Sequence, residues 1–221
     1  MKIFKYQYCN NLFLDYNYVG NNKYNKDDSE FYGSVSPVLH DVDSIENLVF
    51  AEIGVFRGDS TRSIFEYCNV EKGYLIDPFS KDIAAGCNDK DFSNKFLDEE
   101  LKLATKHRMA MFEDKCEWIE KMSCDAHFDI PDDTLDFLFI DGAHDYASVM
   151  SDLVLYYDKV KVGGVISGDD FSNRYKHSQG FGVVEALNDF CKIRNIKEVN
   201  VYRHPHKEVE YYSAFSFVKK D

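Results

Sequence analysis

The feature that most constrains the fold is a short apolar run that ends in an acid and is followed by two glycines. Residues 49–61 read Val-Phe-Ala-Glu-Ile-Gly-Val-Phe-Arg-Gly-Asp-Ser-Thr. Val49–Ile53 suits a buried parallel strand, and Gly54 permits a positive φ and a close approach of a ligand to the backbone. Asp59 to Thr61 suits the start of a helix, whose N–H groups would face that ligand. The competing interpretation is an ordinary strand-to-helix turn.

Other apolar runs also end in acids. Residues 73–76 lead to Asp77, 135–140 to Asp141, and 162–168 to Asp169 and Asp170. Because the carboxyl ends of parallel strands meet at one edge of a sheet, where ligands bind, Glu52 and these acids are predicted to share a site. The alternatives are a solvated strand end for Asp77, a helix N-cap for Asp141, and a turn for Asp169-Asp170.

The alternation of strands and helices predicts an α/β fold with a doubly wound, mostly parallel, seven-stranded sheet. Alternating apolar and polar residues at 198–203 and 210–219 predict a C-terminal antiparallel strand pair. The remaining expected strands are 49–53, 73–77, 108–112, 135–140 and 162–167, and the expected helices are 36–47, 60–68, 94–106, 114–122, 146–160 and 182–193. Residues 36–221 are expected to form one domain, preceded by an N-terminal arm at 1–35.

The composition excludes several classes of partner. The 221 residues are 44% hydrophobic, which is normal for a globular domain. The net charge of −13 repels phosphate backbones and anionic membranes, so neither a nucleic acid nor a membrane is expected as a partner. The six cysteines form no Cys-x-x-Cys pair, and no apolar run approaches 18 residues. The cytoplasm is therefore the expected location, and a homo-oligomer is left open.

The glycine spacing at Gly54 and Gly58 resembles the first nucleotide-binding loop of class I S-adenosylmethionine-dependent methyltransferases, whereas dehydrogenases carry Gly-x-Gly-x-x-Gly. Ile-Asp-Gly-Ala-His-Asp-Tyr at 140–146 and Val-Gly-Gly-Val-Ile-Ser-Gly-Asp-Asp-Phe at 162–171 narrow the resemblance to the metal-dependent O-methyltransferases. The chain is most similar to the macrocin type, which methylates deoxysugar hydroxyls on macrolides. The resemblance covers residues 48–190.

This resemblance implies a set of site residues. Asp141, Asp169 and Asp170 match the ligands of Mg²⁺ or another divalent cation, and His144 matches the proposed base beside Asp141 in the catalytic centre. A buried histidine bonded to the backbone is the alternative for His144. S-adenosylmethionine would be bound by Glu52, Gly54, Phe56, Arg57, Gly58, Ser60, Asp77, Asp114 and Asp141, with Asp77 on the ribose.

The predicted function is methyl transfer to a hydroxyl of a sugar or glycan, so the expected partner is a small-molecule or glycan acceptor. A small phenolic or catechol acceptor is the alternative, although catechol-type enzymes place a lysine where this chain has His144. A non-catalytic cofactor-binding module is a third hypothesis, which the retention of all three expected metal ligands disfavours.

Overall fold

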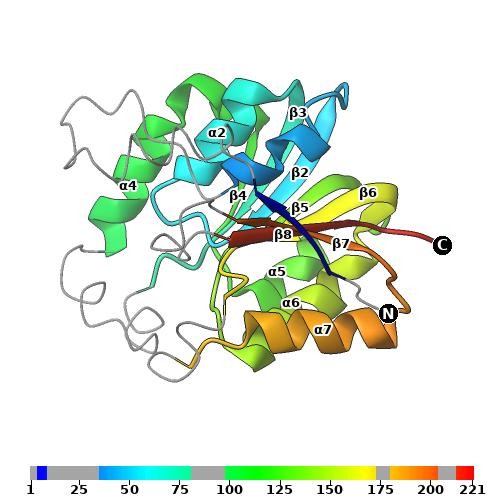
Figure 1. Cartoon of the computed structure of the whole chain (residues 1–221). Helices are drawn as coiled ribbons and strands as arrows, with labels where there is room; N and C mark the ends of the chain where they lie inside the picture. The colour runs from blue at the N-terminus through cyan, green and yellow to red at the C-terminus, as the bar shows by residue number, and fades with distance from the viewer. Residues whose placement is uncertain (1–3, 9–34, 81–97, 173–179, 204–212) are drawn as a thin grey trace.

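The computed structural model describes residues 4–8, 35–80, 98–172, 180–203 and 213–221, which form one sheet with helices on both faces (Figure 1). The strands lie in the order β1-β7-β8-β6-β5-β2-β3-β4. Only β8 runs antiparallel to its neighbours, β6 and β7. The mostly parallel class and the C-terminal antiparallel pair are confirmed, but the sheet has eight strands, where seven were predicted. The strands are β1 Phe4–Tyr8, β2 Leu48–Ile53, β3 Val70–Ile76, β4 Cys116–Ile119, β5 Leu135–Ile140, β6 Val160–Gly168, β7 Val199–Arg203 and β8 Ser213–Val218.

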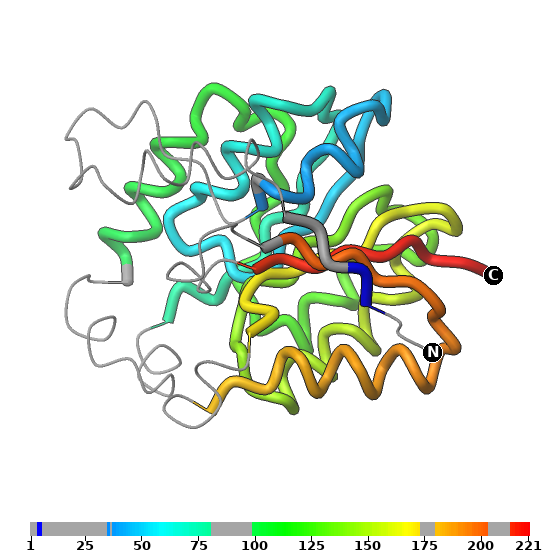
Figure 2. The backbone as a smooth tube through the Cα atoms, in the orientation of Figure 1, coloured from blue at the N-terminus to red at the C-terminus, as the bar shows by residue number. Residues whose placement is uncertain are grey.

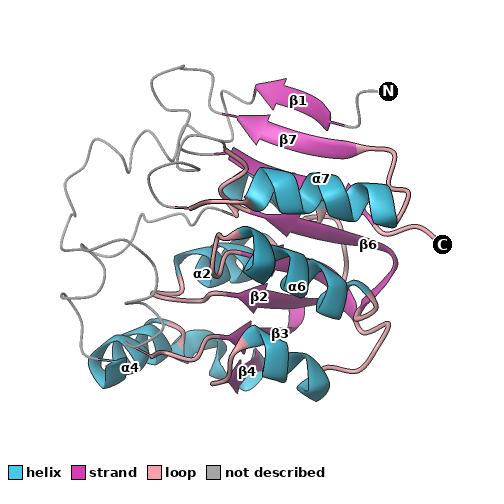
Figure 3. Ribbon diagram, turned by 90° about the horizontal axis from the view of Figure 1, so that it is seen from below, coloured by secondary structure: helices cyan, strands magenta, loops and turns pink. Residues whose placement is uncertain are grey.

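Two helical layers cover the sheet (Figure 3). One contains α6 (Tyr146–Tyr157), α7 (Val183–Ile193), α5 (Ser123–Ala126) and η3 (His127–Asp129), and the other contains η1 (Ser36–Asp41), α2 (Asp59–Tyr67) and the junction of α4 (Asp98–Arg108) with η2 (Ala110–Lys115). The longer helices α2, α6 and α7 each bury several residues against the sheet. In α7 the buried residues recur at helical spacing and pack on the sheet: Val183, Ala186, Leu187, Phe190 and Cys191.

The chain order of the strands reverses beside β2. From β2 the chain moves outward to β3 and β4, and then returns to place β5 on the other side of β2. The two central strands are aligned over their last four residues, from Phe50 opposite Phe137 to Ile53 opposite Ile140. A change of winding direction opens a crevice beyond the carboxyl ends of the two strands. The fold therefore places the predicted site between β2 and β5.

Two expected elements between β3 and β5 are wrong. Arg108, expected to begin a strand, ends α4, and the expected helix at 114–122 is replaced by the end of η2 and by β4. The apolar run at 109–112 misled the prediction, because only Met109 is buried and Phe112 half-buried in it, whereas Ala110 and Met111 are exposed. β4 is an edge strand whose first three residues are only half-buried, so it lacks a continuous apolar run.

The N-terminal segment contributes a strand. β1 pairs in parallel with β7, from Phe4 opposite Val199 to Tyr8 opposite Arg203, and forms one edge of the sheet (Figure 2). The expected helix at 36–47 is shorter, a 3-10 helix over Ser36–Asp41. The rest of the expected arm, residues 1–3 and 9–34, lies outside the described residues, as do 81–97, 173–179 and the whole loop 204–212 between β7 and β8. Within the described chain, no helix has the length and apolarity needed to cross a membrane.

Candidate functional site

The acids at the strand ends lie along one edge of the sheet. The residue that follows each strand still donates its N–H to the last residue of a neighbouring strand: Gly54 to Ile76 at 2.9 Å, Asp77 to Ile119 at 3.2 Å, Asp141 to Ile53 at 2.8 Å and Asp169 to Ile140 at 3.1 Å. The four strand ends are therefore level. Asp77, Asp141 and Asp169 all begin their loops at this edge, as the sequence predicts.

Gly54 brings the ends of β2 and β5 into contact. Its φ is +89°, and a Cβ at this position would lie 2.1 Å from the carbonyl oxygen of Asp141 and 2.7 Å from the Cα of Gly142. Both neighbours are backbone atoms, which cannot rotate away. From the sequence, Gly54 was explained by the approach of a ligand to the backbone. The structure adds that the loop after β5 already requires a glycine at this position, because it leaves no room for a Cβ.

Asp77 shapes the loop that follows β2. Its carboxylate accepts the backbone N–H of Phe56 at 2.8 Å and that of Phe79 at 2.7 Å. Phe56 and Phe79 have φ values of +48° and +45°, which are uncommon for residues with a side chain. Burial raises the pKa of Asp77, and these N–H groups oppose the shift. Asp77 thus holds the loop, and it keeps lone pairs that further hydrogen bonds can use.

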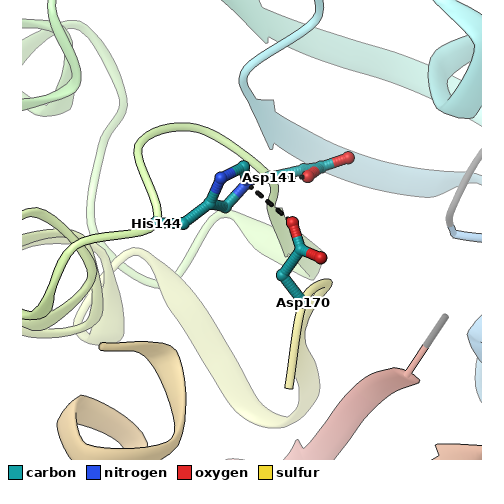
Figure 4. A group of neighbouring side chains, drawn as sticks. All are labelled: Asp141, His144 and Asp170. Atoms are coloured by element: carbon teal, nitrogen blue, oxygen red, sulfur yellow. Dashed lines mark ion pairs between the residues drawn. The ribbon is translucent and has the colours of Figure 1, made fainter. Parts of the chain in front are cut away.

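Three side chains converge between β5 and β6 (Figure 4). Nε2 of His144 lies 3.2 Å from Oδ2 of Asp170 and 3.5 Å from Oδ1 of Asp141. Asp141 follows β5, His144 lies in the loop before α6, and Asp170 follows β6 in a left-handed conformation with φ +56°. The structure therefore brings the expected base and two of the three expected metal ligands together.

The loop before α6 is fixed by its own contacts. Asp145, and not Asp141, caps α6, since its carboxylate accepts N–H groups of Ala147 at 3.0 Å and Ser148 at 3.1 Å. The ring of Phe181 lies 4.7 Å from the His144 ring, and the N–H of Gly182 donates to the carbonyl of His144 at 2.8 Å. Residues 181–182 therefore support the loop that carries His144, a role that no sequence pattern indicated.

Charge in the cluster is unbalanced. Burial lowers the pKa of His144, but the adjacent carboxylates of Asp141 and Asp170 raise it more, so its pKa is above the ordinary value. Burial raises the pKa of Asp170, His144 lowers it, and Asp141 raises it, with a net increase. A half-buried pair of carboxylates beside one imidazole favours protons or a cation.

The remaining predicted residues are more dispersed. Glu52 is buried and accepts a hydrogen bond from Thr61, and burial raises its pKa well above the usual range. The hydroxyl of Ser60 accepts the N–H of Val35 at 3.3 Å, while Arg57 lies next to Asp59, with 3.7 Å between Nε and Oδ2. Both residues therefore contact neighbouring parts of the protein.

Asp114 lies at the opposite end of the strands, next to the amino end of β4. It is exposed in η2, just before β4 begins at Cys116, and β4 runs parallel to β3. The resemblance implied that Asp114 binds the cofactor, but its position lies away from the carboxyl ends of the strands, where Asp77 and Asp141 lie. The loop that does follow β4 begins at Glu120, beside the Asp77 end of β3.

The cluster has donor atoms that suit a divalent cation. Asp141, His144 and Asp170 each offer one ligand atom, and these atoms all lie within 4.8 Å of one another. Carboxylate oxygens suit Mg²⁺, and a set that includes an imidazole also suits Mn²⁺ and other first-row cations. Asp169 is not part of this group. The residues present therefore fit a cation, with His144 where the third aspartate was expected.

The part of the chain that carries these residues matches a known protein family. A methyltransferase domain family matches residues 51–171, which include the Gly54 loop and Asp77 as well as the cluster. An uncharacterized protein, R132, from Acanthamoeba polyphaga mimivirus is 32% identical over 132 residues. That match covers 58% of this chain and 53% of R132, so the chain spans about half the length of this curated relative.

Solved structures share the fold. The N-methyltransferase NodS from Bradyrhizobium japonicum has a TM-score of 0.60 at 10% identity, with 85% of this chain and 94% of NodS covered. An rRNA methylase from Streptococcus thermophilus gives 0.58 at 10% identity, covering 83% and 95%. SMU.1697c of Streptococcus mutans, a putative methyltransferase in complex with SAH, gives 0.58 at 11% identity, covering 82% and 96%.

Such low identities show the fold alone. The family match supports methyltransferase activity and S-adenosylmethionine as the cofactor, because it covers the strand-end loops that form the candidate site. The family match covers more than half of this chain, which therefore belongs to the methyltransferase domain family.

Proposed function

We propose that the protein is a metal-dependent O-methyltransferase that uses S-adenosylmethionine to methylate a hydroxyl of a sugar or glycan. The observation that carries the proposal is the convergence of Asp141, His144 and Asp170, within 4.8 Å, beside the loop that begins at Gly54. The family match supports methyl transfer in general. The type of acceptor and the metal requirement rest on the donor atoms of the cluster and on the sequence resemblance.

S-adenosylmethionine supplies the methyl group, and the residues around Gly54 and Asp77 would bind it. Phe56 follows the strand end in a fixed left-handed conformation, and Asp77 can accept the ribose hydroxyls while it holds the Phe56 N–H. Glu52 would support this binding site from inside the domain, where its hydrogen bond with Thr61 joins β2 to α2.

Asp141 and Asp170 would hold a divalent cation. When bound, the cation supplies positive charge that lowers the pKa of an acceptor hydroxyl. Nε2 of His144 faces the same space and would accept the hydroxyl proton as a general base. His144 can instead serve as a third ligand, and the two roles differ in one measurable property. Loss of a ligand weakens metal affinity, whereas loss of a base alone does not.

The surface charge bears on the acceptor. One solved structure of this fold is an rRNA methylase, but a net charge of −13 opposes binding to a polyanion. A neutral hydroxylated acceptor is therefore favoured. A phenolic or catechol acceptor is the second candidate, since a cation would bind vicinal hydroxyls of either class.

Turnover of S-adenosylmethionine tests the proposal. The dialysed protein would be assayed with Mg²⁺ against panels of sugars, glycans and catechols, and S-adenosylhomocysteine binding would be compared with NAD binding by calorimetry. We expect S-adenosylhomocysteine binding and turnover with a sugar or glycan. Turnover with catechols alone would replace the acceptor class. Failure to bind S-adenosylhomocysteine would refute the function.

A further inference from the structure

α4 contacts the loop that follows β2 at a point remote in sequence. The hydroxyl of Thr105 donates to the carbonyl of Phe56 at 2.7 Å, and Nη1 of Arg108 donates to the carbonyl of Arg57 at 3.2 Å. Nη2 of Arg108 also lies 2.7 Å from Oδ1 of Asp59, the first residue of α2. The last turn of α4 therefore contacts residues 56, 57 and 59 in turn.

Phe56 is held from both sides. Its N–H donates to Asp77, which follows β3, and its carbonyl accepts from Thr105 of α4. Its φ of +48° is a conformation that is unfavourable for a residue with a Cβ. Such a conformation persists only where the surroundings impose it. The two hydrogen bonds supply that constraint.

The contact is shielded from solvent. Thr105 is 1% exposed, and the side chains of Arg108 and Asp59 are 17% and 14% exposed. Without the Thr105 hydroxyl, the Phe56 carbonyl would lose its hydrogen bond at a place that water hardly reaches. Because an unsatisfied buried carbonyl is unfavourable, loop conformations that turn it towards solvent would become more populated. A loop that populates its binding conformation only in part binds its ligand more weakly by that fraction.

We infer that Thr105 and Arg108 are positioning residues for the methyl donor, acting through the backbone of Phe56 and Arg57. The inference rests on the proposed function, because it assumes that this loop binds S-adenosylmethionine. Neither residue needs to touch the donor. Their effect is to hold the loop in the bound shape beforehand, so that binding does not have to order it.

Thr105→Val tests this inference, since it removes the hydroxyl and keeps the shape. Binding of S-adenosylhomocysteine is measured by calorimetry on the full chain. We expect about tenfold weaker affinity, equivalent to about 1.4 kcal/mol. Thr105→Ser, which keeps the donor, should stay within about twofold of wild type, well below that tenfold step.

A matched control separates positioning from a general loss of stability. Ser167 is also buried, and its hydroxyl donates to the Phe215 carbonyl at 2.7 Å, on the β8 side of β6 and away from the Gly54 loop. Ser167→Ala removes a bond of the same kind and should lower the melting temperature without changing affinity. Amide hydrogen exchange provides a local readout, and the Phe56 N–H should exchange faster in Thr105→Val while amides within β2 do not.

The outcomes are decisive. The inference is overturned if Thr105→Val binds within about twofold of wild type, or if Ser167→Ala loses as much affinity as Thr105→Val. Should Thr105→Val fail to fold, Arg108→Met serves in its place, and unchanged affinity in that variant has the same consequence. A wild-type chain that does not bind S-adenosylhomocysteine would instead contradict the proposed function.

Discussion

Substitution of Gly54 by alanine would test how the ends of β2 and β5 are joined. Two costs add. An alanine at φ +89° costs about 1–2 kcal/mol. Its Cβ would also lie 2.1 Å from the carbonyl oxygen of Asp141, whereas non-bonded heavy atoms rest at ~3.5 Å. Relief of the whole overlap requires the two strand ends to move apart by roughly 1.4 Å.

That movement gives the second cost its size. It stretches the hydrogen bond from the N–H of Asp141 to the carbonyl of Ile53, now 2.8 Å long, at about 0.5–1.5 kcal/mol. Overpacking of a close contact adds about 1–3 kcal/mol. Gly54→Ala should therefore lower the free energy of unfolding by about 3–6 kcal/mol in total. Asp141 would move with the strand end, so donor binding should weaken as well.

The chain offers a matched control in Gly163. Its φ is +87°, nearly that of Gly54, but a Cβ there would meet no atom within 4 Å. Gly163→Ala measures the backbone cost alone, about 1–2 kcal/mol. Urea denaturation followed by circular dichroism gives both values. If the two variants are destabilised equally, within about 0.5 kcal/mol as for independent sites, the contact between Gly54 and Asp141 does not constrain the fold.

Further predictions concern the site and its surroundings. His144→Ala should lower single-turnover rates by about 10²–10⁴ with unchanged affinity for S-adenosylhomocysteine, and a mutant near the wild-type rate would remove His144 from the mechanism. Excess chelator should abolish methyl transfer until Mg²⁺ is restored, and full activity in chelator would refute the metal requirement. Asp77→Ala should weaken S-adenosylhomocysteine binding by about 1–3 kcal/mol, as read by calorimetry, and unchanged affinity would contradict its role. Burial raises the pKa of Asp152 to about 6, so the folded state holds this proton more tightly than the unfolded state. The stability that it contributes, on the order of 3 kcal/mol, is present below the unfolded pKa and is lost as pH rises through about 6. Asp152→Asn should therefore flatten the pH dependence of the unfolding free energy between about pH 4 and 7, and an unchanged slope would contradict this assignment.

The central part of the fold was readable from the sequence. Val49–Ile53 and Leu135–Ile140 are apolar runs because they form β2 and β5, the central strands buried on both faces. The helices at 60–68 and 182–193 were predicted to within one or two residues, since their apolar spacing matches one buried face. Edge strands were harder. β4 is half-buried, and β1 is specified by pairing with β7, nearly 200 positions away in the sequence.

The sequence by itself determined the fold class, the acids at the strand ends and the loop glycine, because each depends on a local pattern of burial or backbone conformation. Only the tertiary structure decided which acids meet. It groups Asp170, and not Asp169, with Asp141 and His144. It places Asp114 at the amino end of β4, away from the other acids. The tie from Thr105 to Phe56 spans 49 positions in the chain. Distances between residues so far apart depend on how the strands and helices pack, and no periodicity in the sequence records them.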